Sequence, residues 1–116
     1  MKVLIVEDDR VLSLMLTRMV QRIGHEVVGT LTEGEIAVET MRSNSVDLVL
    51  MDIMLEGKID GIDAMEQIRG TSDVDVIYVT GNSDNSTIER AQKTNYVEYL
   101  VKPIVYEQLK QAIDKI

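Results

Sequence analysis

Five short apolar runs, rich in Val, Ile and Leu, alternate along this chain with segments of helical periodicity. The runs lie at residues 3–6, 27–31, 48–51, 74–79 and 97–101. Their nearly continuous apolar character predicts strands that are covered on both faces. Between and after them, apolar residues spaced by three or four predict helices over residues 12–23, 35–42, 62–69, 86–93 and 105–116. Gly24 is expected to end the first helix, because glycine readily adopts a left-handed conformation.

Strands that alternate with helices imply right-handed crossovers and a parallel sheet with helices on both sides. Five such units predict an α/β fold, a flavodoxin-like, doubly wound five-stranded parallel sheet with strand order 2-1-3-4-5 and five helices. In this order the first and third strands are neighbours, and ligands bind where their carboxyl ends meet. We expect residues 1–116 to form one domain, because no linker or repeat divides them. Because the last predicted helix runs to residue 116, we expect no effector domain within these residues, which could form a stand-alone module or one domain of a longer protein.

Composition narrows the function classes. A formal net charge of −8 with few clustered Lys or Arg argues against nucleic-acid binding. No run approaches the roughly 18 apolar residues of a membrane span, and no signal peptide is evident. The absence of cysteine excludes disulfides and fits a cytoplasmic protein. The only histidine, His25, has no second His or Cys nearby, so we expect a solvated loop residue rather than a zinc ligand.

Acidic side chains follow two of the predicted strands that the strand order makes adjacent. Glu7, Asp8 and Asp9 come after the first strand, and Asp52 comes after the third. Two like charges about 4 Å apart repel by roughly 4 kcal/mol at an effective dielectric near 20. A solvated loop would explain either acidic site alone, but two converging sites favour a hard cation such as Mg²⁺. Asp9 is better placed to begin the first helix than to bind metal.

The ends of the fourth and fifth strands add groups suited to phosphoryl chemistry on the Asp52 carboxylate. Asp52 beside a metal could act as a nucleophile toward phosphorus, and Lys102 after the fifth strand could neutralise the transferred oxygens. Thr80 after the fourth strand could donate a hydrogen bond, and Gly81 would leave space for a donor. We predict a cis Lys102–Pro103 peptide bond, which would aim the lysine inward, although only about 5–6% of X–Pro bonds are cis.

These motifs together resemble the receiver domain of two-component response regulators, the CheY-like family, and the resemblance covers the whole chain. Any one motif is weak, but all of them in order at the expected strand ends make a specific match. The matching positions are Val6–Glu7–Asp8, Asp52, Thr80 and Lys102–Pro103.

The resemblance implies that Asp52 accepts a phosphoryl group from the phosphohistidine of a sensor histidine kinase or phosphotransfer protein. It implies Mg²⁺ bound by Asp8 and Asp52, by Glu7 through water and by the backbone carbonyl of Met54. The chain would be a signalling switch and no turnover enzyme.

Thr80 and Tyr99 correspond to the family's switch pair, whose movement remodels the face formed by the fourth helix, fifth strand and fifth helix. A downstream effector domain or protein would read that face, and many relatives form homodimers through it. In the resting state we expect the Tyr99 hydroxyl to lie in water.

One segment departs from the family pattern. The usual loop after the acceptor contains Met-Pro followed shortly by Asp-Gly, whereas this chain has no proline at residues 54–61 and one extra residue. The Asp60–Gly61 pair is retained. Met54 and Asn82 occupy positions where family members tune the lifetime of the acyl phosphate.

Three other classes fit parts of the pattern. A haloacid-dehalogenase-type phosphatase also uses an aspartate nucleophile, but its second acid corresponds here to Met54, and no cap insertion is present. A flavin or dinucleotide module would need a Gly- or Ser/Thr-rich loop where this chain has three acids. A degenerate receiver could keep the fold as a protein-binding module, although such a domain would most simply have lost Asp52 or Lys102.

Overall fold

Five parallel strands form one sheet in the order β2-β1-β3-β4-β5, as predicted. The computed structural model describes residues 1–116. Val6, the last residue of β1, pairs with Met51, the last residue of β3, so the two strands end side by side. The strand bounds are β1 Lys2–Val6, β2 Glu26–Leu31, β3 Leu48–Met51, β4 Asp75–Thr80 and β5 Glu98–Val101.

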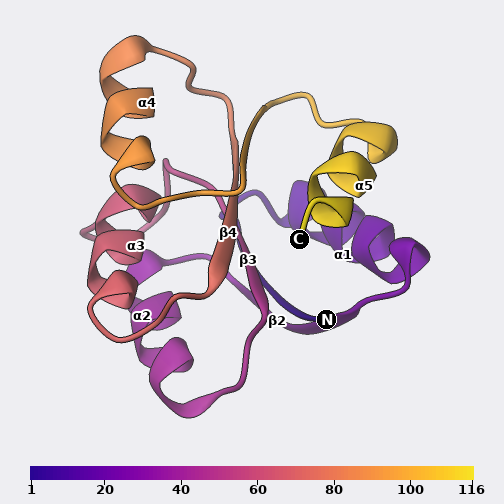
Figure 1. Cartoon of the computed structure of the whole chain (residues 1–116), viewed down its shortest axis with the longest axis horizontal. Coiled ribbons are helices and arrows are strands. Elements are labelled where there is room, and N and C mark those ends of the chain that lie inside the picture. Colours follow the sequence, from indigo (N-terminus) through magenta and orange to yellow (C-terminus); the bar gives the residue numbers. More distant parts are fainter.

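The five helices lie on both faces of the sheet. Figure 1 shows α1 and α5 on one face and α2, α3 and α4 on the other. This arrangement, with the strand order of the sheet, confirms the predicted flavodoxin-like architecture. The helix bounds are α1 Arg10–Ile23, α2 Gly34–Ser43, α3 Gly61–Arg69, α4 Asn85–Gln92 and α5 Tyr106–Asp114.

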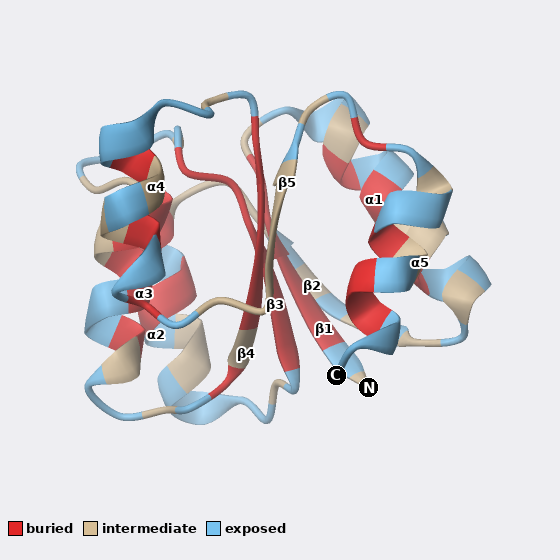
Figure 2. Ribbon diagram, turned by 45° about the horizontal axis from the view of Figure 1, so that its top comes forward, coloured by how far each residue is buried: buried red, intermediate tan, exposed pale blue.

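Burial differs between the central and the edge strands (Figure 2). Every residue of β3 is buried, and β1 and β4 are buried except at their first residue. The expectation that all five strands are covered on both faces is wrong for β2 and β5. In β2 exposed and half-buried residues alternate, and Val28 is 38% exposed. These two strands lie at the sheet edges, where the helices do not cover both faces.

Local sequence signals set the helix ends. The Asp9 carboxylate accepts hydrogen bonds from Val11 N–H and Leu12 N–H, so Asp9 caps α1 as expected. Gly24 ends α1 with φ of 109°, a conformation that favours glycine. His25 lies in the connection between α1 and β2, as expected, and is half-buried, because its ring accepts a hydrogen bond from the amino group of Met1 at 2.8 Å.

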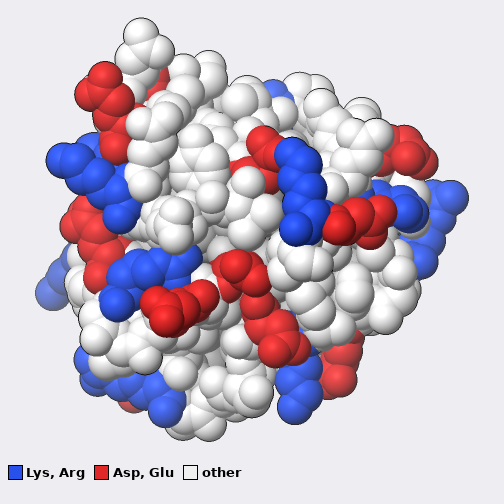
Figure 3. Space-filling view, viewed as in Figure 1, with Lys and Arg blue, Asp and Glu red and all other residues white.

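The surface carries interspersed charges of both signs. On the face in Figure 3, Lys and Arg lie among acidic side chains and do not gather into one basic patch. None of the five helices has the length and apolar character needed to cross a membrane.

Candidate functional site

The acidic residues after β1 and β3 meet at the carboxyl edge of the sheet. Asp52 N–H donates to the carbonyl of Val6 at 2.9 Å, which continues the pairing of the two strands beyond their ends. One carboxylate oxygen from each of Glu7, Asp8 and Asp52 lies within 4.8 Å of the others. The structure therefore brings together the three carboxylates that the sequence placed at adjacent strand ends.

Glu7 and Asp52 are almost completely buried, with 1% and 4% of their surfaces exposed, and Asp8 is more open to solvent. Burial raises the pKa of Glu7 to about 7, and the nearby Asp52 carboxylate adds to the shift. The Lys102 ammonium and the Asp9 N–H act in the opposite direction but do not cancel it. The site therefore concentrates negative charge where water provides little screening.

Lys102 supplies the positive charge of the site. Its Nζ lies 3.0 Å from Asp52 Oδ2 and 2.9 Å from Glu7 Oε1, so one ammonium serves two buried carboxylates. Burial alone would lower the pKa of Lys102, but these carboxylates outweigh it and raise the pKa above its ordinary value. The Lys102 N–H donates to the Thr80 carbonyl at 2.9 Å, and the Lys102–Pro103 peptide bond is cis.

Asp52 is held at both of its oxygens. Oδ1 accepts a hydrogen bond from the Ile53 N–H at 2.7 Å, and Oδ2 accepts one from Lys102. Its side chain faces a hollow of about 440 Å³, and Gly81 and Asn82 also lie along the wall of this hollow. The hollow is lined by Asp8, Asp9, Asp52, Met54, Thr80, Gly81, Asn82 and Lys102.

The donor set fits a hard divalent cation. Carboxylate oxygens are the ligands that Mg²⁺ prefers, and here three carboxylates converge with a single ammonium between them. Glu7 Oε1 is buried and accepts no hydrogen bond, because its contact with Lys102 lacks hydrogen-bond geometry. A buried carboxylate oxygen without a donor is costly, which favours a further cationic partner at this position. The side chain of Met54 is 64% exposed at the rim of the hollow and offers no second acid there.

Thr80 and Tyr99 both contact Asn82, which lies between them. Thr80 is fully buried, and its hydroxyl oxygen accepts the Asn82 N–H at 3.3 Å. The hydroxyl of Tyr99 donates to the Asn82 carbonyl. We expected the Tyr99 hydroxyl to lie in water in the resting state. It is instead bonded to the backbone of Asn82. Burial raises the pKa of Tyr99, with smaller contributions from Asp84, Tyr96 and Asp52.

Gly61 is a site residue whose role the sequence reasoning missed. Its N–H donates to the Ile53 carbonyl at 2.8 Å, and a Cβ at this position would lie 1.9 Å from the Asp52 carbonyl oxygen. Only glycine leaves room for the backbone of Asp52. The retained Asp60–Gly61 pair was the signal that could have revealed this contact. By contrast, a Cβ on Gly81 would meet nothing within 4 Å, which agrees with the open space expected there.

The unusual loop at residues 54–61 is fastened to α2. The Glu35 carboxylate accepts hydrogen bonds from the N–H groups of Lys58 and Ile59, at 3.3 Å and 3.1 Å. The bond from Ile59 and, to a lesser extent, that from Lys58 hold the pKa of Glu35 below its ordinary value, against the opposing effect of burial. Gly57, with φ of 93°, passes directly against the same carboxylate. The segment that departs from the family pattern is thus held by a contact with a neighbouring helix.

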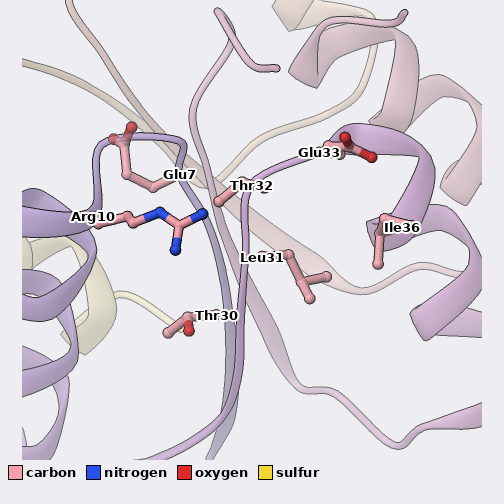
Figure 4. Close-up of a pocket in the computed structure, with 7 residues that line it drawn as sticks. All are labelled: Glu7, Arg10, Thr30, Leu31, Thr32, Glu33 and Ile36. Carbon is pink, nitrogen blue, oxygen red and sulfur yellow. The ribbon is translucent and has the colours of Figure 1, made fainter. Parts of the chain in front are cut away.

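A second pocket of about 350 Å³ lies on the other side of Glu7, toward β2 (Figure 4). Arg10 extends into it toward Thr32, and Leu31 and Ile36 supply its apolar part. It contains neither Asp8 nor Asp52 and is therefore separate from the hollow that Asp52 faces.

The strand order and the acidic site at the switch point define a CheY-like α/β module. The sequence profile of the response regulator receiver domain matches residues 3–114, so the chain belongs to the response regulator receiver domain family. It is 34% identical over 113 residues to the transcriptional regulatory protein PdtaR of Mycobacterium tuberculosis, covering 97% of this chain and 55% of that protein. The chain spans about half the length of the curated relatives it matches.

Two solved structures show the same architecture. The signal receiver domain of a modulated diguanylate cyclase from Desulfovibrio desulfuricans G20 is 32% identical, with a TM-score of 0.91 over 98% of this chain and 90% of that one. The receiver domain of a sensor histidine kinase from Pseudomonas aeruginosa PAO1 is 26% identical, with a TM-score of 0.87 and coverage of 98% and 94%. That second structure holds a magnesium ion coordinated in the active site cleft.

Proposed function

We propose that this chain is a phosphorylatable receiver whose Asp52 takes a phosphoryl group from the phosphohistidine of a sensor kinase or phosphotransfer protein, in a Mg²⁺-dependent reaction. The observation that carries the proposal is the buried Asp52 carboxylate, held by Lys102 and the Ile53 N–H beside two further carboxylates. Membership of the receiver family supports it. The magnesium ion in a receiver of similar fold supports the choice of metal.

The contacts of Asp52 suggest what each residue of the site does in the reaction. A carboxylate oxygen of Asp52 attacks phosphorus, the P–N bond to the donor imidazole breaks, and the imidazole keeps the electron pair and takes up a proton. Lys102 stays close to Asp52 and pairs with a phosphoryl oxygen, while the Thr80 hydroxyl donates to another. Asp8, Asp52 and the Met54 carbonyl would hold Mg²⁺ directly and Glu7 would hold it through water; when bound, the ion neutralises charge on the transferred group.

The same residues connect the reaction to an output surface. The Thr80 hydroxyl would exchange part of its contact with Asn82 for a bond to the phosphoryl group, and the Tyr99 contact with the same residue would respond. Asn82 lies just before α4, so the α4, β5 and α5 face would change. A downstream effector, or a second copy of the chain, would read this face.

Phosphorylation by acetyl phosphate tests the proposal directly. With Mg²⁺ present, the intact mass of the chain should increase by one phosphoryl group, and hydroxylamine, which cleaves acyl phosphates, should remove it. Asp52→Asn should abolish the increase. Asp47→Asn is the matched control, because Asp47 is exposed at the opposite end of β3, and it should be modified like the parent. A chelator should prevent modification of both.

Two outcomes would contradict the proposal. An unchanged mass in the parent would favour a degenerate receiver that only binds protein. Steady hydrolysis of a phosphate monoester by the parent would favour a phosphatase over a signalling switch.

A further inference from the structure

Three of the four tyrosines form one cluster, which we call the tyrosine cluster: Tyr78, Tyr96 and Tyr99. Their ring centroids are 5.8–6.0 Å apart in all three pairs. Tyr78 on β4 lies directly opposite Tyr99 on β5 in the strand register. The chain has no Phe or Trp, so the large aromatic surface beside the switch residue Tyr99 comes entirely from this cluster.

Tyr78 is the fully buried member of the tyrosine cluster, and its hydroxyl makes one defined bond. It lies 2.7 Å from Thr94 Oγ1, and Thr94 Oγ1 donates to the Ala91 carbonyl at 2.6 Å. Because Thr94 gives its only hydroxyl proton to Ala91, Tyr78 must be the donor to Thr94. Burial raises the pKa of Tyr78 to about 12, so the phenol keeps this proton at neutral pH.

The tyrosine cluster therefore contacts the chain at both ends of α4. Tyr99 bonds to Asn82, three residues before the helix starts, and Tyr78 bonds to Thr94, two residues after it ends. The helix itself buries only Thr87 and Ala91, which is little apolar surface to fix its position. Its placement therefore depends on polar contacts, and Arg90 on the helix pairs with Asp60 and Asp63 at 3.1 Å and 3.2 Å. Beyond the end of the helix, the Arg69 side chain also reaches the Thr94 carbonyl at 2.8 Å.

We propose that Tyr78 is a positioning residue of the phosphorylation switch: its ring fixes the inward place of the Tyr99 ring, and its hydroxyl anchors the end of α4 through Thr94. The proposal rests on the function proposed above. It assigns separate tasks to two parts of one side chain. The ring should control Tyr99, and the hydroxyl should control the last turn of α4.

The hydroxyl is tested by Tyr78→Phe and by Thr94→Val, with Tyr96→Phe as the matched control. Tyr96→Phe removes the same group from a neighbouring ring, but the Tyr96 hydroxyl makes no hydrogen bond to another residue. Amide hydrogen exchange at residues 93–95 should become roughly two- to tenfold faster in Tyr78→Phe and in Thr94→Val, the range expected for one neutral hydrogen bond. The contact from Arg69 remains and limits the effect. Amides of β3 report global unfolding and serve as the reference.

A double variant shows whether the two residues act through one bond. Tyr78→Phe combined with Thr94→Val should exchange no faster at residues 93–95 than the more affected single variant. Effects that multiply, or a Tyr78→Phe variant that exchanges like Tyr96→Phe, would overturn the assignment of the hydroxyl.

The ring is tested by Tyr78→Leu, with Tyr78→Met as a second variant if the first does not fold. The readout is the NMR signal of ¹³C-labelled Tyr99, with and without Mg²⁺ and beryllofluoride. In the parent and in Tyr78→Phe, Tyr99 should give one defined signal that shifts on addition of beryllofluoride. In Tyr78→Leu, which lacks the ring, the Tyr99 signal should be averaged over several ring positions and should shift little on addition of beryllofluoride. A parent-like Tyr99 signal in that variant would overturn the assignment of the ring.

Intact-mass measurement of the parent separates the two proposals. If acetyl phosphate modifies the parent at Asp52 and the Tyr78 variants behave like the parent at α4 and Tyr99, only the role of Tyr78 is wrong. If the parent is not modified, the proposed function itself fails.

Discussion

Gly61→Ala is expected to be the most damaging single-methyl change near the acceptor site. A Cβ at residue 61 would lie 1.9 Å from the Asp52 carbonyl oxygen and 2.9 Å from both the carbonyl carbon and Met51 Cγ. Backbone strain is not the cause, because the φ of Gly61 is not positive. The cost comes from space alone, and the nearest obstructing group, the Asp52 carbonyl, belongs to buried backbone that cannot rotate away.

The size of the effect follows from this geometry. Overpacking a well-ordered site usually costs about 1–3 kcal/mol. An overlap with backbone at 1.9 Å belongs at the upper end, so we expect a loss of about 3 kcal/mol from a total stability of roughly 5–15 kcal/mol. With a urea m-value of about 1–3 kcal/mol/M, the unfolding midpoint should fall by roughly 1 M or more. Because Asp52 must move, Mg²⁺ binding should weaken as well.

Urea unfolding of three glycine variants checks the argument. Gly81→Ala adds a methyl in the same hollow, with nothing within 4 Å of it, and should change stability by less than about 1 kcal/mol. Gly24→Ala also has free space, but its φ of 109° should cost about 1 kcal/mol. We therefore expect the losses to rank Gly61→Ala, Gly24→Ala, Gly81→Ala. A Gly61→Ala protein as stable as the Gly81→Ala protein would refute the reasoning.

Three further expectations concern charge. Mg²⁺ should raise the thermal unfolding midpoint of the parent. Asp8→Asn should reduce this increment because a metal-bound carboxylate is lost, and tenfold weaker binding would remove about 1.4 kcal/mol of the stabilisation by Mg²⁺. An equal increment in calorimetry would exclude Asp8 from the site. Lys102→Met leaves two buried carboxylates without their cation. Because the Lys102 side chain is 27% exposed, we expect a loss of about 1–3 kcal/mol in urea unfolding without metal. Lys110→Met, which breaks an exposed ion pair within α5, should cost below about 0.5 kcal/mol. Burial would raise the pKa of Asp60, but the Asp63 N–H and the Arg90 guanidinium lower this pKa on balance. The ionised Asp60 carboxylate therefore stabilises the fold fully above its ordinary pKa of 3.8, and this contribution is lost as the pH falls through the lower pKa of the folded state. Asp60→Asn should make stability less dependent on pH in this acid range, and an unchanged pH dependence would contradict the argument.

The sheet topology and the convergence of the acidic strand ends could be predicted because both depend on order along the chain. Alternating strands and helices allow few topologies, and the chosen order makes β1 and β3 neighbours. Glu7 and Asp52 then have to meet. The exposure of β2 was mispredicted from its apolar composition, although its place at the edge of the predicted sheet already implied one open side.

Other contacts could not be read from sequence order. Lys102 reaches Glu7 as well as Asp52, and this sharing depends on side-chain length and on the direction in which the chain leaves β5. Gly61 touches the Asp52 backbone only because the loop between them folds back by a definite amount. The Tyr99 hydroxyl has two plausible positions for one sequence, in water or on Asn82, and packing against Tyr78 accompanies the second.

The Glu35 contact makes the segment after the acceptor a two-part unit. The carboxylate on α2 accepts hydrogen bonds from the N–H groups of Lys58 and Ile59, so a residue that lies some twenty positions earlier helps to hold residues 54–61. The bridge between Glu33 and Glu56 holds the same segment from the start of this helix. Grafting this longer segment into another receiver would therefore require Glu35 to be transplanted with it. In a recipient with a different side chain at that helix position, the two N–H groups would have to bond to water, and the grafted segment would lose its two hydrogen bonds to α2.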